Sequence, residues 1–500
     1  GHDRGARARR GHDRPLDSVK QLRSRLFATH SVEHLVDQGE RGGLRRALRA
    51  RDLVAVGLGT MIGGGIFTTI GPGVALAGPA VIIAYLLDGV AALFAALAYA
   101  ELGAMVPIAG SAYTYAYATL GELVAWIIGW DLILEYGVSA APVAQQWSSY
   151  VQSALQSFGL RFPLWAQSAH YAFSGPWWHV DWTHTTVDVL GAAFVLVLSG
   201  LLAIGVRETA FSNNAFVIVK VGALAVFVIA GVPLFHPQNL VPFAPLGWKH
   251  GASGIVPAAA LVFFSYIGFD TATTAAEETR IPARDIPIGV IGSLAIGTVI
   301  YCAVACVLVG AVPWRQVDQH AALAAALGPL HSAALNAIII VGALAGTTSV
   351  ALLSLFGQTR IFYAMARDRL LPPFVAAIHP RFRTPARMTM TTGVIVAFLT
   401  LVVPLDALLE LVNIGTYSAF IIVCAGVVWL RYARPELPRA FRSPLVPLFP
   451  VCGIVLSLYL STQGLGPLTW WRFIVWLAIG LIFYAVYGHR HSLARRGAAP

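Results

Sequence analysis

Two clusters of glycine and polar residues interrupt long apolar stretches of this chain. The first is Gly63 to Gly65, and the second is residues 265–270, Ser-Tyr-Ile-Gly-Phe-Asp. Glycine lets a helical backbone unwind, so the helix that resumes afterwards begins with unbonded N–H groups that suit a carboxylate. The carbonyl groups that end the preceding helix suit an ammonium group. Together the clusters predict a site for a zwitterion such as an α-amino acid, although the first cluster alone fits close helix packing equally well.

Four of the ionisable residues within apolar stretches are candidates for a functional role, because their charged forms are costly there. A lysine whose surroundings change can take up and release a proton, so Lys220 is predicted to couple protons to transport, with a permanent ion pair as the alternative. Asp270 is predicted to gate or line a cavity, with capping of a restarted helix as the alternative. Glu135 fits a functional and a structural role equally, and Asp131 fits a structural one.

The elements that would position these groups are membrane spans. Of 500 residues, 57% are apolar and 12% are charged, and the mean hydropathy is +0.70, as in an integral membrane protein. Twelve stretches are long enough to cross a bilayer: 52–77, 81–106, 121–150, 185–205, 212–233, 253–278, 286–312, 332–365, 388–404, 407–430, 445–463 and 470–488. The two clusters fall in the first and sixth stretches. Paired interruptions of this kind mark the binding site of many transporters.

The basic residues predict the orientation of the chain. Most of the 34 lysines and arginines fall on one side if the N-terminus is cytoplasmic. We therefore expect a multi-pass protein of the plasma (inner) membrane, with both termini in the cytoplasm. Residues 1–43 are expected to form a disordered tail, and the basic residues after it would contact membrane lipid. These charges account for the net charge of +10, so no nucleic-acid partner is expected.

Other chemistry is not indicated. The four cysteines lie in apolar stretches without a CxxC pair, which predicts neither a disulfide nor a metal site. The sequence contains no GxxxxGK[ST] loop and no HExxH helix, so an ATP-driven pump and a zinc protease are not predicted. No nucleophile and base are paired as in an enzyme, and no cofactor is expected. Energy for uphill transport must come from an ion or from exchange.

Six motifs occur in order along residues 44–490. They are 61–67, 107–115, 129–136, 264–270 with 276–282, 357–365 and 413–416. With them the chain resembles the amino acid–polyamine–organocation superfamily, and within it the bacterial relatives of the cationic amino acid transporter family. The resemblance implies an all-α membrane protein of twelve transmembrane helices, with a LeuT-like 5+5 inverted repeat and discontinuous helices 1 and 6. The repeats would be residues 44–235 and 236–430, followed by two extra spans in 431–488 and a cytoplasmic tail, 489–500.

The resemblance also implies a site. The substrate carboxylate would meet amide groups at Gly64 and Gly65, its ammonium group would meet nearby carbonyls, and Phe264 would close over it. Lys220 matches a lysine that takes the place of a sodium ion in proton-coupled members. The implied substrate-binding residues are Met61, Gly63, Gly64, Gly65, Phe264, Ser265, Ile267 and Ser354, and the gating or network residues are Glu135, Asp270, Thr348 and Ser349. Gly64 replaces a threonine or serine common in the family, and the small Ser354 would widen the pocket.

The predicted function is transport of α-amino acids, coupled to protons in symport and working by alternating access. A proton-independent amino acid exchanger is the nearest alternative, and a membrane receptor that binds amino acid without moving it is a second. Whether the substrate is cationic or small and neutral is open, because members of the resembled group carry both. The expected partners are the amino acid, protons and membrane lipid.

Overall fold

The computed structural model describes residues 47–105, 111–170, 185–205, 210–382 and 384–492. These residues form helices and contain no β-strand, only isolated bridges. The expected tail of residues 1–43 and the end of the C-terminal tail lie outside the described residues. Eight helical stretches of the described chain are long and apolar enough to cross a membrane, and three shorter apolar helices, Val189–Ala203, Ala386–Val402 and Leu448–Gly464, accompany them.

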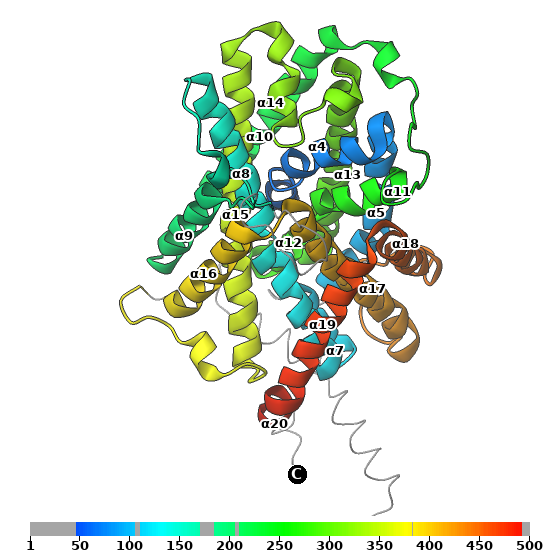
Figure 1. The fold of residues 1–500 in the computed structure, drawn as a ribbon. Coiled ribbons are helices and arrows are strands. Elements are labelled where there is room, and N and C mark those ends of the chain that lie inside the picture. The colour runs from blue at the N-terminus through cyan, green and yellow to red at the C-terminus, as the bar shows by residue number, and fades with distance from the viewer. Residues whose placement is uncertain (1–46, 106–110, 171–184, 206–209, 383, 493–500) are drawn as a thin grey trace, which may run out of the picture.

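The α-helices follow one another along the chain, with short 3-10 or π segments between some of them (Figure 1). The α-helices are α3 Ala50–Met61, α4 Ile66–Ala77, α5 Val81–Met105, α6 Ser111–Thr119, α7 Glu122–Leu132, α8 Ala140–Ser157, α9 Val189–Ala203, α10 Ala210–Gly231, α11 Ile255–Val262, α12 Thr271–Thr274, α13 Pro282–Ala311, α14 Ala322–Ala326, α15 Ala333–Arg367, α16 Ala386–Val402, α17 Leu405–Ala433, α18 Leu448–Gly464, α19 Pro467–Phe483 and α20 His489–His491. Two further segments matter for the site, the π-helical η2 Ile133–Val138 and the 3-10 helix η6 Phe263–Tyr266.

The first predicted interruption is present. Helix α3 ends at Met61, a turn follows, and α4 begins at Ile66. Gly63 in this turn has a φ of +127°, and a Cβ there would lie 2.4 Å from the carbonyl oxygen of Gly346 on α15. No larger residue fits both the backbone conformation and this contact.

The second predicted interruption is present as well. Helix α11 tightens into η6, the chain turns through residues 267–270, and α12 follows. Gly268 has a φ of +112°. Its carbonyl oxygen accepts a hydrogen bond from the hydroxyl of Thr60, in the last turn of α3, at 2.7 Å. The two interruptions therefore contact each other directly.

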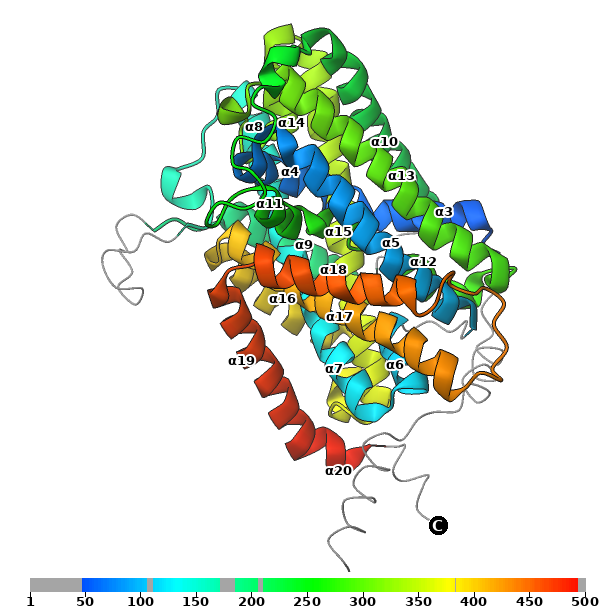
Figure 2. The ribbon, with the colours of Figure 1, turned by 90° about the vertical axis from the view of Figure 1, so that its right-hand side faces the viewer.

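The two broken spans run through the helix bundle in opposite directions. α3 and α12 lie toward one end of the helix bundle, and α4 and α11 lie toward the other (Figure 2). At the end where α3 and α12 lie, the residues just before α3 form backbone hydrogen bonds with residues 278–280, which follow α12. The amide groups of Ala47 and Leu48 donate to the carbonyl of Glu278 at 2.8 and 2.9 Å, and the amide of Arg280 donates to that of Leu48 at 2.9 Å. These backbone bonds join the two half-helices.

The last long helix, α19, runs along the outside of the bundle (Figure 2). Aromatic side chains attach it to α7. The rings of Trp130 and Trp476 stack with centroids 4.7 Å apart, and the indole N–H of Trp126 donates to the carbonyl of Gly480 at 2.9 Å. α19 also packs on α17, and its buried residues are Thr469, Phe473 and Gly480.

A buried ion-pair cluster closes the end of the bundle where α5 and α17 finish. Glu101 is 2% exposed and accepts two hydrogen bonds from the guanidinium of Arg431, at 2.9 and 2.8 Å. The amide of Ser443 donates to the same carboxylate at 2.8 Å, and Nε of Arg439 lies 3.4 Å from it. One carboxylate thus connects α5, α17 and the loop that follows α17.

Replacing Glu101 by glutamine should lower the free energy of unfolding by about 3–5 kcal/mol, because two guanidinium groups would lose their buried counter-charge. Thermal unfolding of the purified protein in detergent measures the change. Glu436→Gln is the matched control, since that carboxylate is 63% exposed and lies 4.0 Å from Arg434. The control should change stability by less than about 1 kcal/mol. Equal stabilities of the two variants would contradict the assigned role of the cluster.

Candidate functional site

A cavity of about 340 Å³ lies beside the two interruptions. Both broken spans, η2 with the following Ser139, Tyr113 of α6 and the second half of α15 form its wall. Among the residues expected to bind substrate or to gate, those in the wall are Gly64, Gly65, Glu135, Phe264, Ile267 and Ser354. The breaks thus bring residues nearly 300 positions apart in sequence around one space.

The first break presents bare backbone to this cavity. The amide groups of Gly64 and Gly65 donate to no acceptor among the described residues, and α4 begins directly after them. A Cβ on Gly64 would lie 2.7 Å from a methyl group of Val350, and one on Gly65 would lie 2.3 Å from Cα of Ser265. Glycine is therefore needed here for close approach. Free N–H groups at the start of a helix form an anion-binding site.

Lys220 lies in the middle of α10 and is completely buried. Its ammonium group donates a hydrogen bond to the carbonyl of Gly59, near the end of α3. On α15, a Cβ added to Gly346 would lie 3.6 Å from Cδ of the lysine. The buried lysine is thus bonded to the backbone of the first broken span. Of the expected α15 network residues, Ser349 is fully buried and Thr348 is half-buried.

Three expected substrate residues do not line the cavity. Met61 is buried with its side chain toward α13, where a Cβ on Gly297 would touch its methyl group. Gly63 packs on the backbone of α15. Ser265 shares a hydrogen bond of 2.7 Å with Thr69 of α4, and its carbonyl accepts from Tyr301 at 2.9 Å. In this structure these side chains and the glycine hold the two breaks in place.

Glu135 lies in the π-helical segment η2, which the sequence analysis did not predict. A π turn inserts one extra residue into a helix and is frequent at functional sites. The turn separates α7 from α8, so that Glu135 reaches the cavity, whereas Asp131, one turn earlier, accepts a hydrogen bond from Ser418 of α17 at 2.8 Å. The two carboxylates therefore have different surroundings although they are four residues apart.

Asp270 stands at the N-cap position of α12, but its side chain makes no capping hydrogen bond. It accepts a hydrogen bond of 3.3 Å from the hydroxyl of Tyr136, in η2. The structure thus differs from the capping alternative and places Asp270 in contact with the segment that carries Glu135. The short α12 is stabilised instead by the hydroxyl groups of Thr271, Thr273 and Thr274, which bond to preceding carbonyls.

The cavity extends from the breaks toward the end of the bundle at which α3 and α12 lie. Its wall there includes Leu48, Thr274, Glu278 and Arg360. The guanidinium of Arg360 lies 4.2 Å from the ring centre of Phe356, one turn earlier on α15. At this end the wall changes from apolar to charged side chains, as expected for an approach to water.

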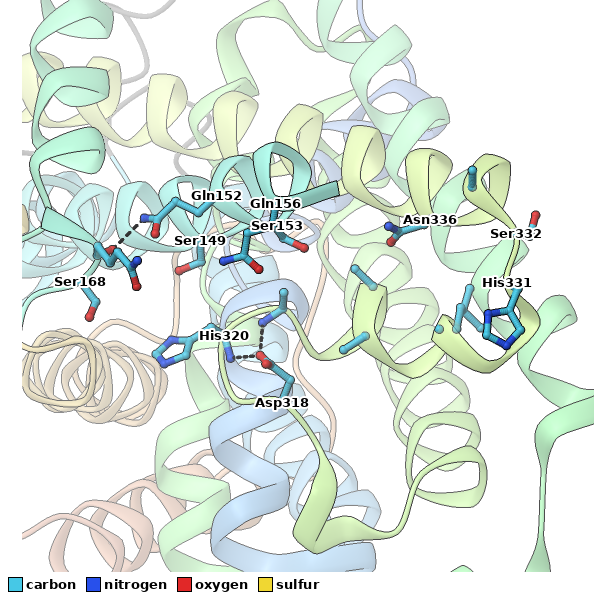
Figure 3. Close-up of a pocket in the computed structure, with 17 residues that line it drawn as sticks. Ser149, Gln152, Ser153, Gln156, Ser168, Asp318, His320, His331, Ser332 and Asn336 are labelled. Atoms are coloured by element: carbon cyan, nitrogen blue, oxygen red, sulfur yellow. Dashed lines mark hydrogen bonds between the residues drawn. The ribbon is translucent and has the colours of Figure 1, made fainter. Parts of the chain in front are cut away.

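A second cavity, of about 530 Å³, lies at the opposite end (Figure 3). Hydroxyl and amide side chains of α8 face a loop that carries Asp318 and His320, and the carboxylate of Asp318 accepts the amide groups of His320 and Ala321 at 2.7 Å each. Phe67, just after the first break, packs edge-on against Tyr150 of α8 with ring centroids 6.0 Å apart. Both rings are buried, and Tyr150 is adjacent in sequence to Ser149 in the wall of the second cavity.

Residues 48–484 match the model of the amino acid permease family. The chain belongs to this family. It is 41% identical over 479 residues to the branched-chain amino acid permease BcaP of Bacillus subtilis, covering 94% of this chain and 99% of the relative. It is 39% identical to the methylthioribose transporter of the same organism over 95% and 100% of the two chains. Human cationic amino acid transporter 4 is 33% identical over 85% of this chain and 66% of its own length.

The family settles the class of protein. This permease is a multi-pass membrane protein of amino-acid transport, and its relatives are transporters and permeases rather than enzymes, as the sequence predicted. The resemblance to the amino acid–polyamine–organocation superfamily and to cationic amino acid transporters is confirmed by the same matches.

Proposed function

We propose that this permease is a symporter that moves an α-amino acid together with protons by alternating access. The observation that carries the proposal is the pair of unbonded amide groups, those of Gly64 and Gly65, facing a cavity between two broken helices. An amino acid carboxylate placed there would satisfy them, and carbonyls at the ends of α3 and η6 would accept from its ammonium group. The site needs no metal or cofactor for this chemistry.

Each expected residue has a role in this proposal. The two breaks are held in place by Met61, Gly63 and Ser265. The α-carboxylate and α-ammonium groups of the substrate are bound by Gly64, Gly65 and Ile267. The ring of Phe264 covers the bound substrate. Lys220 carries the coupling proton, since it is fully buried and bonded to the broken span. Glu135, Asp270, Thr348 and Ser349 form the polar network that changes partners as the spans move.

The proposed architecture is that of twelve spans in two inverted repeats, residues 44–235 and 236–430, with an added pair of spans in 431–488. The opposite directions of the two broken spans support it. The end of the bundle at which α3 and α12 lie carries Arg49, Arg280, Arg360 and Arg431, so we place it in the cytoplasm of the plasma membrane, together with both termini. On this orientation the central cavity opens to the cytoplasm.

We propose neutral aliphatic amino acids as the substrate class. The cavity wall contains the apolar side chains of Val56, Ile267, Val350 and Leu353, which suit an apolar substrate side chain. The match to a branched-chain permease supports this. Glu135 in the same wall favours a second candidate, a cationic amino acid, for which its carboxylate would be the partner.

Uptake by the purified permease in lipid vesicles tests the proposal. Labelled leucine should accumulate only when the outside is more acidic, and unlabelled valine or isoleucine should compete better than lysine. Competition by lysine alone would support the cationic candidate, and competition by methylthioribose alone would overturn the amino acid assignment. Uptake that requires internal substrate and ignores the pH gradient would identify an exchanger. Binding without any uptake would identify a receptor.

Replacing Ser354 by leucine should shift preference toward small substrates. Ser354 lines the cavity on α15, and its hydroxyl accepts a hydrogen bond from Ser139 at 3.4 Å. A leucine there fills space that the branched side chain of a substrate would occupy. A difference of one methylene group between substrate and apolar pocket changes selectivity by about 10–200-fold. Uptake of leucine should therefore fall at least about tenfold relative to that of alanine. Ser354→Ala, which adds no volume, should keep the original preference.

A further inference from the structure

Asp88 is a carboxyl group that the proposed site does not use. It lies about one third of the way along α5 and is completely buried. Both of its oxygen atoms are inaccessible, and neither has a hydrogen-bond partner among the described residues. No other carboxyl group in the described part of the chain has both oxygens in this situation. By contrast, the buried Asp188 accepts bonds from Ser148 and from the amide of Gly191.

Three tyrosines are near enough to this carboxyl group for its charge to act on them. They are Tyr85 of α5, Tyr266 of η6 and Tyr417 of α17, and the hydroxyl of Tyr417 is itself buried without a partner among the described residues. On α13, Tyr301 and Cys302 lie beside these rings. α11, which also packs on α5, carries no titratable residue. No described lysine or arginine forms an ion pair with Asp88.

A hydrogen bond links the second break to the helical turn that carries Asp88. The hydroxyl of Tyr266, the last residue of η6, donates to the backbone carbonyl of Tyr85 at 2.7 Å. Tyr85 precedes Asp88 by one helical turn. A Cβ on Gly89, next to Asp88, would lie 3.2 Å from the same hydroxyl. Any movement of η6 against α5 must therefore break this bond and change the surroundings of Asp88.

An ionised carboxylate in this place would be unfavourable. Removing such a charge from water costs several kcal/mol even after relaxation when no cation or donor compensates it. Protonation removes that cost, and carboxyl groups inside membranes commonly belong to proton pathways. The alternative, a purely structural aspartate, would be expected to hold donors as Asp188 does.

We propose that Asp88 is a second protonation site of the transport cycle, protonated in this conformation and deprotonated when η6 moves away from α5. In the step, the O–H bond of the carboxylic acid breaks and the proton passes to a water molecule that reaches the opened site, which becomes hydronium. The reverse step takes the proton back from hydronium. The proposal rests on the proton coupling proposed above, and it adds to Lys220 of α10 a second proton-binding group, Asp88 of α5.

Infrared difference spectroscopy of the full-length permease in lipid vesicles tests the proposal. Wild-type protein should show a carbonyl band of a protonated carboxylic acid that changes when saturating leucine is added. The band should be absent from Asp88→Asn, shifted in Asp88→Glu and retained in Asp131→Asn. A wild-type spectrum without a substrate-sensitive band, or a band that persists in Asp88→Asn, would overturn the proposal. If Asp88→Asn does not fold, the shift in Asp88→Glu decides.

Transport gives an independent readout. Asparagine imitates the neutral acid, so Asp88→Asn should retain exchange of labelled for unlabelled substrate at equal pH. Its accumulation driven by a pH gradient should fall by about tenfold. Undiminished accumulation in this variant would overturn the proposal while leaving amino acid transport and the role of Lys220 intact. Failure of wild-type protein to transport at all would instead overturn the proposed function, and the infrared band would still report on Asp88.

Discussion

Replacing Lys220 by methionine should abolish accumulation of substrate against its gradient while binding of substrate remains measurable. Methionine matches the length of the lysine stem but has neither the charge nor the hydrogen bond to the carbonyl of Gly59. Without a group that binds and releases a proton at the first break, the pH gradient can no longer drive the cycle. Uptake with an acid exterior should fall to the level of empty vesicles, and binding can be measured by calorimetry.

Lys249→Met is the matched control. This lysine is exposed in a loop, where its ammonium group lies 3.4 Å from the amide oxygen of Gln463. Its replacement removes the same charge and should leave accumulation unchanged. Full accumulation by the Lys220 variant would refute the coupling role, and equal losses in both variants would point to an effect of net charge instead.

Replacing Gly65 by alanine should reduce transport by about ten- to a hundredfold, because overpacking of this kind costs about 1–3 kcal/mol. The new Cβ would lie 2.3 Å from Cα and 3.0 Å from the carbonyl oxygen of Ser265, and backbone atoms cannot rotate away. The φ of Gly65 is −79°, outside the left-handed region, so a left-handed backbone adds nothing to the effect of the contact. Initial uptake rates in vesicles measure it.

Gly222→Ala provides the comparison. Gly222 lies on the exposed side of α10, and a Cβ there would meet nothing within 4 Å. Alanine should therefore leave transport unchanged and favour the helix slightly. Thermal unfolding of both variants separates loss of function from loss of fold. A Gly65 variant that folds and transports like the wild type would show that the two breaks need not touch.

The breaks could be predicted from sequence because their cause is local. Gly63 and Gly268 have φ values that glycine adopts and other residues rarely do, so the residue type itself marks the position. The buried Lys220 was visible for a similar reason, since an ammonium group in a long apolar stretch has few structural uses. Of the residues that line the cavity, six belong to the site predicted from the sequence: Gly64, Gly65, Glu135, Phe264, Ile267 and Ser354.

Features that depend on packing between distant segments were not predictable in this way. No residue pattern marks the π turn at Glu135, because an extra residue in a helix leaves the apolar composition unchanged. The partners of Glu101 come from α17 and the loop after it, more than 300 residues away. Asp88 could have been noticed, because a carboxyl group inside an apolar stretch is itself a signal, but the lack of donors around it appears only in three dimensions.

The backbone bonds between residues 47–48 and 278–280 have a mechanical consequence. They join α3 to α12 at the open end of the cavity, so neither half-helix can move without the other. The two half-helices therefore form one rigid unit, and the glycine turns at Gly63 and Gly268 are its hinges. Such a unit moves in one step, so the transport cycle has no intermediate in which α3 has moved and α12 has not.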